Sequence, residues 1–362
     1  ELRHARRSEG TLKRDEKGIP QIYADNSEDL FFAQGYVHAQ DRFFEMDFRR
    51  HVTAGRLAEL VGDGALDTDK YVRTLGWRRV AEQEVKLLDP ETTKLVDAYS
   101  RGVNSYISGK SGSELSLEYT ILSLTGPNYR PTAWTAADSL AWIKAMAWDL
   151  RSNMSDEISR ALSTKNLAVD EVEELYPDYP KDHEPIVTGD DANVRAGTFD
   201  QQGCDETPDP VTLLVPECPT PGLARAAVAS LKAAKNGADA LPALLGTGDG
   251  IGSNSWVVDG SHSVTGRPIL ANDPHLAPSM PGIWYQVGLH CRTVTKECPY
   301  DVAGFSFSGL PGVVVGHNNR IAWGVTTMYA DVADLYLEKV NGETYEYDGK
   351  QVPVETRRET FK

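Results

Sequence analysis

The sequence predicts an α+β protein in which helices come first and an antiparallel sheet follows. Apolar residues recur at helical spacing over residues 26–60, and a Thr135-x-x-Asp138 capping box indicates another helix. In the last third of the chain, short apolar runs are separated by turn dipeptides such as Asn341-Gly342. This order favours a helical amino-terminal half and a sheet in the carboxyl-terminal part.

The expected helices have recognisable starts. Asn26, with Asp29 three residues later, is a candidate cap for the first helix. Its apolar stripe consists of Leu30, Ala33, Val37, Phe44 and Phe48. The helix after the capping box carries Leu140, Ile143 and Ala147 along one side, and a further helix is expected to start at Ser155.

Residues 186–252 differ from the rest of the chain. Acidic residues and several prolines are followed by an alanine-rich stretch over 225–239. This composition suggests a linker rather than a core element.

Four short runs are rich in strand-forming residues: Trp284–Leu289, Val313–Val315, Leu335–Val340 and Tyr345–Tyr347. Asp259-Gly260, Asn341-Gly342 and Asp348-Gly349 are hairpin signals. Residues 354–362 also resemble a strand and have no terminating signal, so we expect this chain to be a fragment of a longer protein.

The composition limits the possible partners. The chain has 362 residues, of which 40% are hydrophobic, enough for a large core or two domains. Its 37 basic and 53 acidic residues give a net charge of −16, which argues against a nucleic-acid or anionic-membrane partner. Residues 1–7 are charged and lack an apolar secretion core, so we expect any signal peptide to have been removed.

The four cysteines form two local pairs, Cys204 with Cys218 and Cys291 with Cys298. Neither pair has the spacing of a zinc site. Two small-loop disulfides in an oxidising compartment would explain an even number of locally paired cysteines, and free buried thiols are the alternative.

Ser253 is the principal candidate for chemistry. It follows a glycine-loaded segment, residues 246–252 (GTGDGIG), and begins a short apolar strand. The flexible Gly252 would allow Ser253 to attack its own preceding peptide bond. Hydrolysis would then make Ser253 an N-terminus whose α-amine, with a pKa of roughly 7.7–8.0, can serve as the general base. The alternative is an ordinary Gly-Ser loop that enters a strand.

Several motifs resemble the penicillin acylase family of N-terminal-nucleophile hydrolases. In the amino-terminal half they are residues 15–24 (DEKGIPQIYA), 35–42 (GYVHAQDR), 49–50 (RR) and 55–59 (GRLAE). In the second half they are residues 253–258 (SNSWVV), 268–275 (PILANDPH), 311–318 (PGVVVGHN) and 321–327 (IAWGVTT). The resemblance covers about residues 11–162 and 246–340 and is weak between them.

The resemblance implies a four-layer αββα sandwich and a precursor that cleaves itself between Gly252 and Ser253. Residues 1–190 would then form the helical α-chain region, 191–252 a linker and spacer, and 253–362 the start of the β chain. The α and β chains would form a heterodimer.

The resemblance also assigns catalytic roles. Ser253 Oγ would attack the substrate carbonyl, and the Thr327 backbone N–H would be an oxyanion donor. His275 would lie beside the nucleophile and tune its amine, unless it is only packed beside a proline turn. The family's second oxyanion donor, an asparagine side chain, would lie beyond residue 362.

Two further sites follow from the resemblance. Met146, Trp148 and Leu150 lie where the family lines its acyl site, with helix-core packing as the equal alternative. Glu157, Asp331, Asp334 and the Ala333 carbonyl resemble its structural calcium site, a hard-oxygen set suited to Ca²⁺. His38, Gln40 and Asp41 match a family motif, and we interpret them as structural polar residues.

The leading interpretation is an autoprocessed, secreted or periplasmic amidohydrolase that cleaves an acyl group from an amine nucleus. A penicillin-type acylase, a lipopeptide acylase and an acyl-homoserine lactone acylase remain open. The rival from another class is a non-catalytic secreted binding protein on the same scaffold, for which the Ser253 hydroxyl would be dispensable.

Overall fold

The computed structural model describes residues 10–124, 129–151, 154–177, 221–245, 251–327, 332–336, 338 and 340–361. The chain divides into two compact units. The first comprises Glu1–Leu150, Ala240–Tyr329 and Thr360–Lys362, and the second comprises Arg151–Asp239 and Ala330–Glu359.

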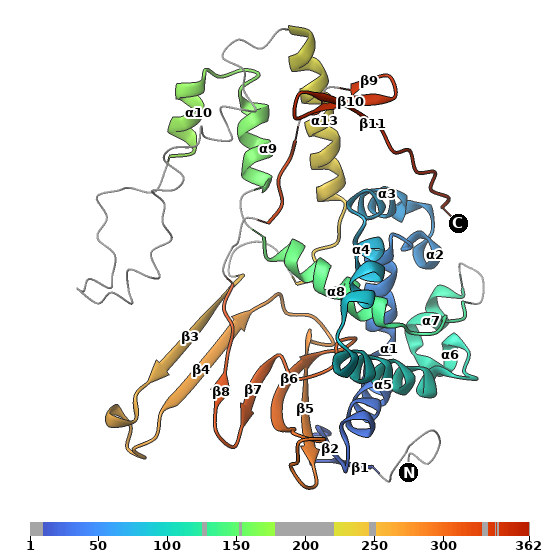
Figure 1. Cartoon of the computed structure of the whole chain (residues 1–362), viewed down its shortest axis with the longest axis vertical. Coiled ribbons are helices and arrows are strands. Elements are labelled where there is room, and N and C mark those ends of the chain that lie inside the picture. The colour runs from blue at the N-terminus through green and yellow to red at the C-terminus, as the bar shows by residue number, and fades with distance from the viewer. Residues whose placement is uncertain are drawn as a thin grey trace. The chain divides into compact units, whose positions relative to one another are not determined.

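A six-stranded sheet forms the frame of the first unit (Figure 1). Its strands, in spatial order, are β1 (Thr11–Arg14), β2 (Pro20–Ala24), β5 (Trp284–Cys291), β6 (Asp301–Phe307), β7 (Val315–Asn318) and β8 (Ala322–Trp323). Neighbouring strands are antiparallel except β2 and β5, which are parallel. The sheet therefore joins the start of the chain to segments that follow Ser253.

Helix α1 (Ser27–Ala54) is the central helix of this unit, and it packs closely on α5 (Pro90–Ile107). Two glycines permit this approach. A Cβ on Gly35 would collide with the Tyr99 carbonyl, and one on Gly102 would collide with the Phe32 carbonyl. The predicted cap of α1 is confirmed, because the Asn26 side chain accepts the Asp29 N–H at 2.9 Å.

The other helices of the first unit are α2 (Ala58–Val61), α3 (Leu66–Leu75), α4 (Trp77–Glu84), α6 (Gly112–Leu115), α7 (Leu117–Leu122) and α8 (Ala136–Asp149), with short 3₁₀ turns at Asp63–Ala65, Val85–Leu87 and Gly260–His262. The predicted capping box is confirmed at the start of α8: Asp138 accepts the Thr135 N–H at 2.6 Å. Helix α8 packs on α4 and α1.

Strands β3 (Gly252–Val258) and β4 (Ile269–His275) form a separate antiparallel ladder that begins with Gly252 opposite His275. The hairpin expected at Asp259-Gly260 differs from the prediction. Asp259 instead accepts the Ser261 N–H at 2.8 Å and starts the 3₁₀ turn, so the connection continues to residue 268. An aspartate can cap a helical turn as readily as it can enter a tight hairpin.

The second unit contains α9 (Met154–Ser163), α10 (Val169–Leu175), α13 (Pro221–Asp239) and a small sheet of β9 (Val340–Asn341), β10 (Thr344–Tyr347) and β11 (Lys350–Pro353). Both predicted Asx-Gly turns are confirmed: Asp348 and Gly349, for example, adopt positive φ between β10 and β11. Of the residues expected to form a strand over 335–340, those that the structure describes are in a strand only at Val340, the first residue of β9. The alanine-rich stretch is a helix rather than an irregular linker, as the high helix propensity of alanine explains.

One hydrophobic core joins the sheet to α1 and α5. Ile22 of β2, Leu30 and Val37 of α1, Val103 of α5 and Leu289 of β5 are at most 1% exposed and belong to the same cluster. The α+β class and the helical amino-terminal half are therefore confirmed. In the part of the chain that the structure describes, no helix combines the length and the apolar character needed to cross a bilayer.

Candidate active site

Ser253 is the second residue of β3 and is half-buried. Its Oγ accepts a hydrogen bond of 2.7 Å from the Thr327 backbone N–H, four residues after β8. Two residues predicted to act on the same carbonyl, 74 positions apart in the sequence, are therefore in direct contact. An N–H directed at this oxygen stabilises negative charge there as the hydroxyl loses its proton.

A single asparagine holds the Thr327 segment against the ladder. Asn272 of β4 donates from Nδ2 to the carbonyls of Asn254 and Val325, at 3.0 and 2.9 Å. Its Oδ1 accepts the Val325 N–H at 3.1 Å. Because it bonds both polar groups of Val325, the Asn272 side chain replaces a strand partner for the backbone that leads to Thr327.

Trp323 and Gly324 position the backbone that brings the Thr327 N–H to Ser253 Oγ. A Cβ on Gly324 would lie 2.7 Å from three atoms of the Asn272 side chain, so only glycine allows the close approach without displacement. Trp323 fixes the preceding strand, since its Nε1 donates to the Val314 carbonyl at 3.0 Å. The Trp323-Gly324 pair thus sets the position of the Thr327 amide.

His275 lies close to the predicted cleavage bond, opposite Gly252 in the ladder. Side chains alternate across a strand, so His275, Asp273 and Asn254 share one face while Ser253 projects from the other. Asn254 Nδ2 lies 2.8 Å from His275 Nε2, and Asp273 lies 3.3 Å from Nδ1. In the uncleaved chain His275 is therefore bonded to its own face of the ladder, and its predicted action on the Ser253 amine stays a prediction.

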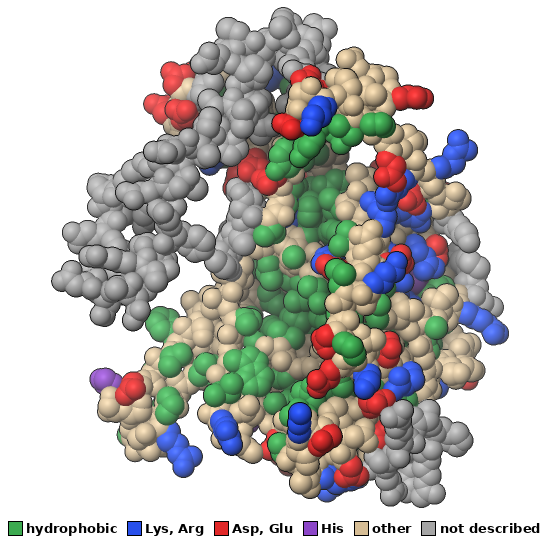
Figure 2. Space-filling model, in the orientation of Figure 1, with side chains coloured by type: hydrophobic (Ala, Val, Ile, Leu, Met, Phe, Trp, Pro, Cys, Tyr) green, Lys and Arg blue, Asp and Glu red, His purple; other side chains and the backbone are tan. Residues whose placement is uncertain are grey.

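The ladder that carries Ser253 is open to solvent. Trp256, Val257 and Ile269 are 68%, 72% and 51% exposed. Figure 2 shows apolar side chains gathered over this ribbon, at the lower left of the view. The nucleophile thus lies at the margin of the described core rather than inside it.

The three predicted acyl-site residues lie at the end of α8. Trp148 is buried and packs edge-to-face on Tyr71 and Trp77, with ring centroids 5.8 and 5.9 Å apart. Met146 is half-buried, and Leu150 is the half-buried C-cap of the helix. The contacts of Trp148 agree with the helix-packing alternative, so a role for these residues in substrate binding stays a prediction.

The predicted calcium ligands lie in the second unit. Glu157 is half-buried on α9, Ala333 is half-buried, Asp334 is exposed, and Asp331 lies outside the described residues. Among the residues that are described, no group of three or more His, Cys, Asp or Glu side chains is arranged to hold a metal ion. The calcium site therefore stays a prediction.

The disulfide between Cys291 and Cys298 is present and closes the loop between β5 and β6. Both cysteines belong to the main core, in which Cys298 is fully buried. Cys204 and Cys218 lie outside the described residues, so their pairing stays a prediction.

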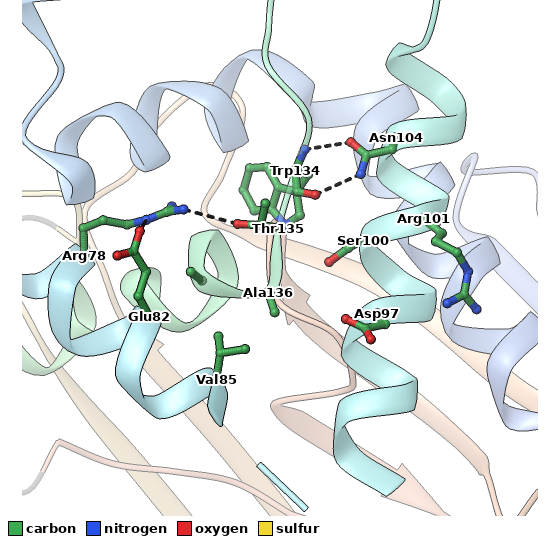
Figure 3. Close-up of a pocket in the computed structure, with 11 residues that line it drawn as sticks. Arg78, Glu82, Val85, Asp97, Ser100, Arg101, Asn104, Trp134, Thr135 and Ala136 are labelled. Atoms are coloured by element: carbon green, nitrogen blue, oxygen red, sulfur yellow. Dashed lines mark hydrogen bonds and ion pairs between the residues drawn. The ribbon is translucent and has the colours of Figure 1, made fainter. Parts of the chain in front are cut away.

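A pocket of about 640 Å³ lies between α4, α5 and the start of α8 (Figure 3). Its polar groups bond one another: Arg78 with Glu82 and Thr135, and Asn104 with the Trp134 backbone. No predicted catalytic, acyl-site or metal residue lines this pocket, so it does not extend the site around Ser253.

Comparison with known proteins places this geometry in context. Residues 9–362 match the penicillin amidase family. The chain belongs to that family. It is 33% identical over 97% of its length to acyl-homoserine lactone acylase QuiP of Pseudomonas aeruginosa, and 32% over 96% to the penicillin acylase 2 proenzyme of Pseudomonas sp. SE83. It is 29% identical over 98% to penicillin G acylase of Escherichia coli.

The match covers only part of each relative. The chain spans 37%, 40% and 43% of these three proteins, less than half of their length. A solved structure of the thermostable penicillin G acylase from Alcaligenes faecalis resembles this chain with a TM-score of 0.42 at 21% identity, over 50% of this chain and 98% of that one.

Two residues of this candidate site were not assigned by sequence reasoning. Asn254 and Asn272 both lie in family motifs, but asparagine in such a motif carries no specific chemical signal. Their roles depend on the β3–β4 register, which pairs Asn254 with Asp273 and Ser255 with Asn272.

Proposed function

We propose that this chain is part of the precursor of an autoprocessed amidohydrolase, in which Ser253 becomes the N-terminal nucleophile. The contact between the Thr327 N–H and Ser253 Oγ, directly after Gly252, carries this proposal. Membership of the penicillin amidase family supports the same chemistry. The reaction class is hydrolysis of a linear amide between an acyl group and an amine.

Maturation would proceed in two balanced steps. Ser253 Oγ attacks the Gly252 carbonyl carbon, the C–N bond breaks, and the hydroxyl proton passes to the nitrogen, which gives an ester and a free amine. Water then hydrolyses the ester, and the products are a Gly252 carboxylate and an N-terminal Ser253 with its hydroxyl restored. The donor at Thr327 stabilises charge on the Ser253 oxygen before attack.

In the mature enzyme the Ser253 α-amine would act as the general base. An α-amine has a pKa of about 7.7–8.0, so much of it is neutral near pH 8 and can accept the hydroxyl proton. The same group would return the proton to the leaving amine. The Thr327 N–H would then serve the oxyanion of the acyl intermediate, for which a second donor is expected beyond residue 362.

The first experiment follows maturation of the full-length protein by intact mass and N-terminal sequencing. Native protein should yield a chain that begins at Ser253, and Ser253→Ala should remain a single chain. Ser253→Cys should still process but lose most amidase activity, because the thiol changes the proton transfer that catalysis requires. Ser255→Ala, which alters the same face of the ladder two residues away, is the matched control and should mature normally. Two mature chains from Ser253→Ala would refute the self-cleavage mechanism.

The identity of the acyl group and of the amine nucleus is the part of the substrate that needs to be determined by assay. The resemblance to penicillin acylases and to an acyl-homoserine lactone acylase supports an acyl-amide but favours different acyl groups and nuclei. Parallel assays of the processed enzyme with penicillin G and with short- and long-chain acyl-homoserine lactones would distinguish them. A processed protein that hydrolyses no amide would favour the binding-protein alternative. The Cys291–Cys298 disulfide supports a secreted or periplasmic location.

We also propose that Glu157, Asp331, Asp334 and the Ala333 carbonyl bind one structural Ca²⁺. Chelation should lower the melting temperature of the processed protein, and Ca²⁺ should restore it better than Mg²⁺, which requires a tighter octahedral shell. Glu157→Ala should impair folding or processing. The exposed neighbour Asp156 on the same helix provides the control variant, Asp156→Ala, which should not. Absence of metal by elemental analysis, with a melting temperature that ignores chelator, would remove the site.

A further inference from the structure

The chain upstream of Ser253 is fixed at Leu245. The Leu245 N–H donates to Asp149 Oδ2 at 2.9 Å, and its carbonyl accepts the Ala277 N–H at 2.9 Å. The side chain is 3% exposed. Both backbone polar groups of Leu245 are therefore bonded to residues distant in the sequence. The N–H is bonded to the side chain of Asp149, and the carbonyl is bonded to the backbone of Ala277.

The residues just before Leu245 are anchored as well. The Thr68 hydroxyl of α3 donates to the Ala240 carbonyl at 2.7 Å. Leu244 packs against the buried cluster of Val52, Leu57 and Ala65. Residues 240–245 thus lie along the helices through specific contacts rather than as a free tether.

Asp149 is an unusual residue for its position in α8. It is the last residue of the helix, where the carbonyl ends of the backbone dipoles disfavour a negative charge. The Leu245 N–H supplies a charge-assisted hydrogen bond that compensates for this placement. In Figure 1 the carboxyl end of α8 lies toward the end of the β3–β4 ladder at which β3 begins.

Both ends of the short segment before the scissile bond are consequently fixed. Leu245 is held by Asp149 and by Ala277, which lies two residues beyond His275. Gly252 is held opposite His275 in the ladder. Only six residues separate Leu245 from Gly252 in the sequence, so an anchor at Leu245 limits how far the Gly252 carbonyl can move from Ser253 Oγ, and small displacements of reacting groups cost rate.

We propose that Asp149 is a positioning residue for self-cleavage, which holds the acyl side of the Gly252–Ser253 bond through Leu245 while Ser253 attacks. This inference rests on the proposed self-cleavage at Ser253. Asp149 touches neither reacting atom, and its effect is exerted on the attack step rather than on hydrolysis of the ester that follows.

The test compares the rate at which full-length precursor converts to the chain that begins at Ser253, after expression at a temperature that yields uncut protein. Asp149→Ala should slow conversion by about tenfold or more, since small misplacements of reacting groups cost rate heavily. Asp149→Asn retains an acceptor oxygen and should recover most of the native rate. Asp97→Ala, which removes an exposed carboxylate from α5, is the control and should convert at the native rate.

Hydroxylamine identifies the affected step, because it cleaves the ester once the ester has formed. It should not accelerate Asp149→Ala, in which attack is limiting; acceleration to the native rate would place the defect after attack and overturn the proposal. Melting temperatures of Ser253→Ala with and without Asp149→Ala should agree within a few degrees, and a large drop would indicate a folding role instead. Native-rate conversion of Asp149→Ala refutes the positioning role alone, whereas failure of the native precursor to cut at Ser253 refutes the proposed function.

Discussion

At the scale of single residues, the site depends on Asn272, whose side-chain amide forms the hydrogen bonds to Val325 that a neighbouring strand would otherwise form. Ser253 could be proposed from the sequence because a hydroxyl directly after a glycine-rich segment suits a nucleophile, although an ordinary Gly-Ser loop has the same pattern. Thr327 could be placed only through a motif. Asn272 could not be assigned, because its three hydrogen bonds exist only when β4 pairs with β3 and the chain returns past β8.

Replacing Asn272 should therefore impair both maturation and catalysis. Asn272→Ala removes the bonds to Val325, so the Thr327 N–H is no longer held on Ser253 Oγ. We expect about a 10²-fold loss in the processing rate, comparable to removal of one oxyanion donor. Gly324→Ala should have a similar effect, because its Cβ would displace the Asn272 side chain.

The control is Asn319→Ala, which loses only an exposed bond to Asp301. It should process and hydrolyse substrate normally. If Asn272→Ala matched this control in both assays, the Thr327 contact would not depend on Asn272.

At the scale of elements, a directed chain of hydrogen bonds fastens α1 to α5 and the sheet. The Gly309 N–H donates to the Tyr99 hydroxyl, which leaves that hydroxyl to donate to His38 Nδ1 at 2.8 Å. His38 Nε2 then donates to Ser306 Oγ at 3.1 Å, and Ser306 donates to the Tyr285 carbonyl. The bond that Nδ1 accepts from Tyr99 requires a neutral imidazole, and these buried contacts agree with the structural interpretation of His38.

This arrangement predicts a loss of stability in mild acid. Burial, assisted by the nearby Arg42 charge, lowers the pKa of His38 to about 3. In the unfolded chain His38 binds a proton below its ordinary pKa of about 6.5, whereas in the folded chain it stays neutral until about pH 3. The free energy of unfolding therefore falls as the pH drops from 6.5 toward 3. Between pH 7.5 and 5 the free energy of unfolding should decrease by about 2 kcal/mol from this residue.

Denaturant titrations at the two pH values measure this decrease. His38→Gln, which can accept from Tyr99 and donate to Ser306 without titrating, should flatten the dependence. The exposed His262 gives the control variant His262→Gln, which should retain the native dependence. An equally steep loss in His38→Gln would assign the effect to other groups.

Elements governed by local chemistry were predictable from the sequence, and those governed by context were not. The Asn26 cap, the Thr135 capping box and the Asp348-Gly349 turn each depend on residues a few positions apart. The turn after β3 and the helix α13 differ from prediction because aspartate and alanine suit more than one local structure. Strands β1 and β2 were missed, since neither their pairing nor their burial is local.

At the scale of the whole molecule, the missed strands explain how two chains would remain one protein after cleavage. Strand β2 pairs in parallel with β5, with Ile22 opposite Leu289, and both residues lie in the main core. Gln34 of α1 exchanges two 2.8 Å bonds with the Gly312 backbone. A cut at Gly252 would thus separate the chain covalently but leave a sheet and a core that both products share.

The processed α and β chains should consequently remain together in high salt. Apolar burial and sheet hydrogen bonds are not screened by ions, whereas the exposed Arg292–Asp25 pair contributes little at any ionic strength. We expect both chains to co-elute from a sizing column in 1 M NaCl and to separate only in denaturant. Ile22→Ala, which removes a fully buried side chain, should weaken the association by about 2–5 kcal/mol and lower the denaturant midpoint, whereas Asp25→Ala should barely move it. Chains that part in salt alone would show that charge pairs, rather than the shared sheet and core, hold the two halves together.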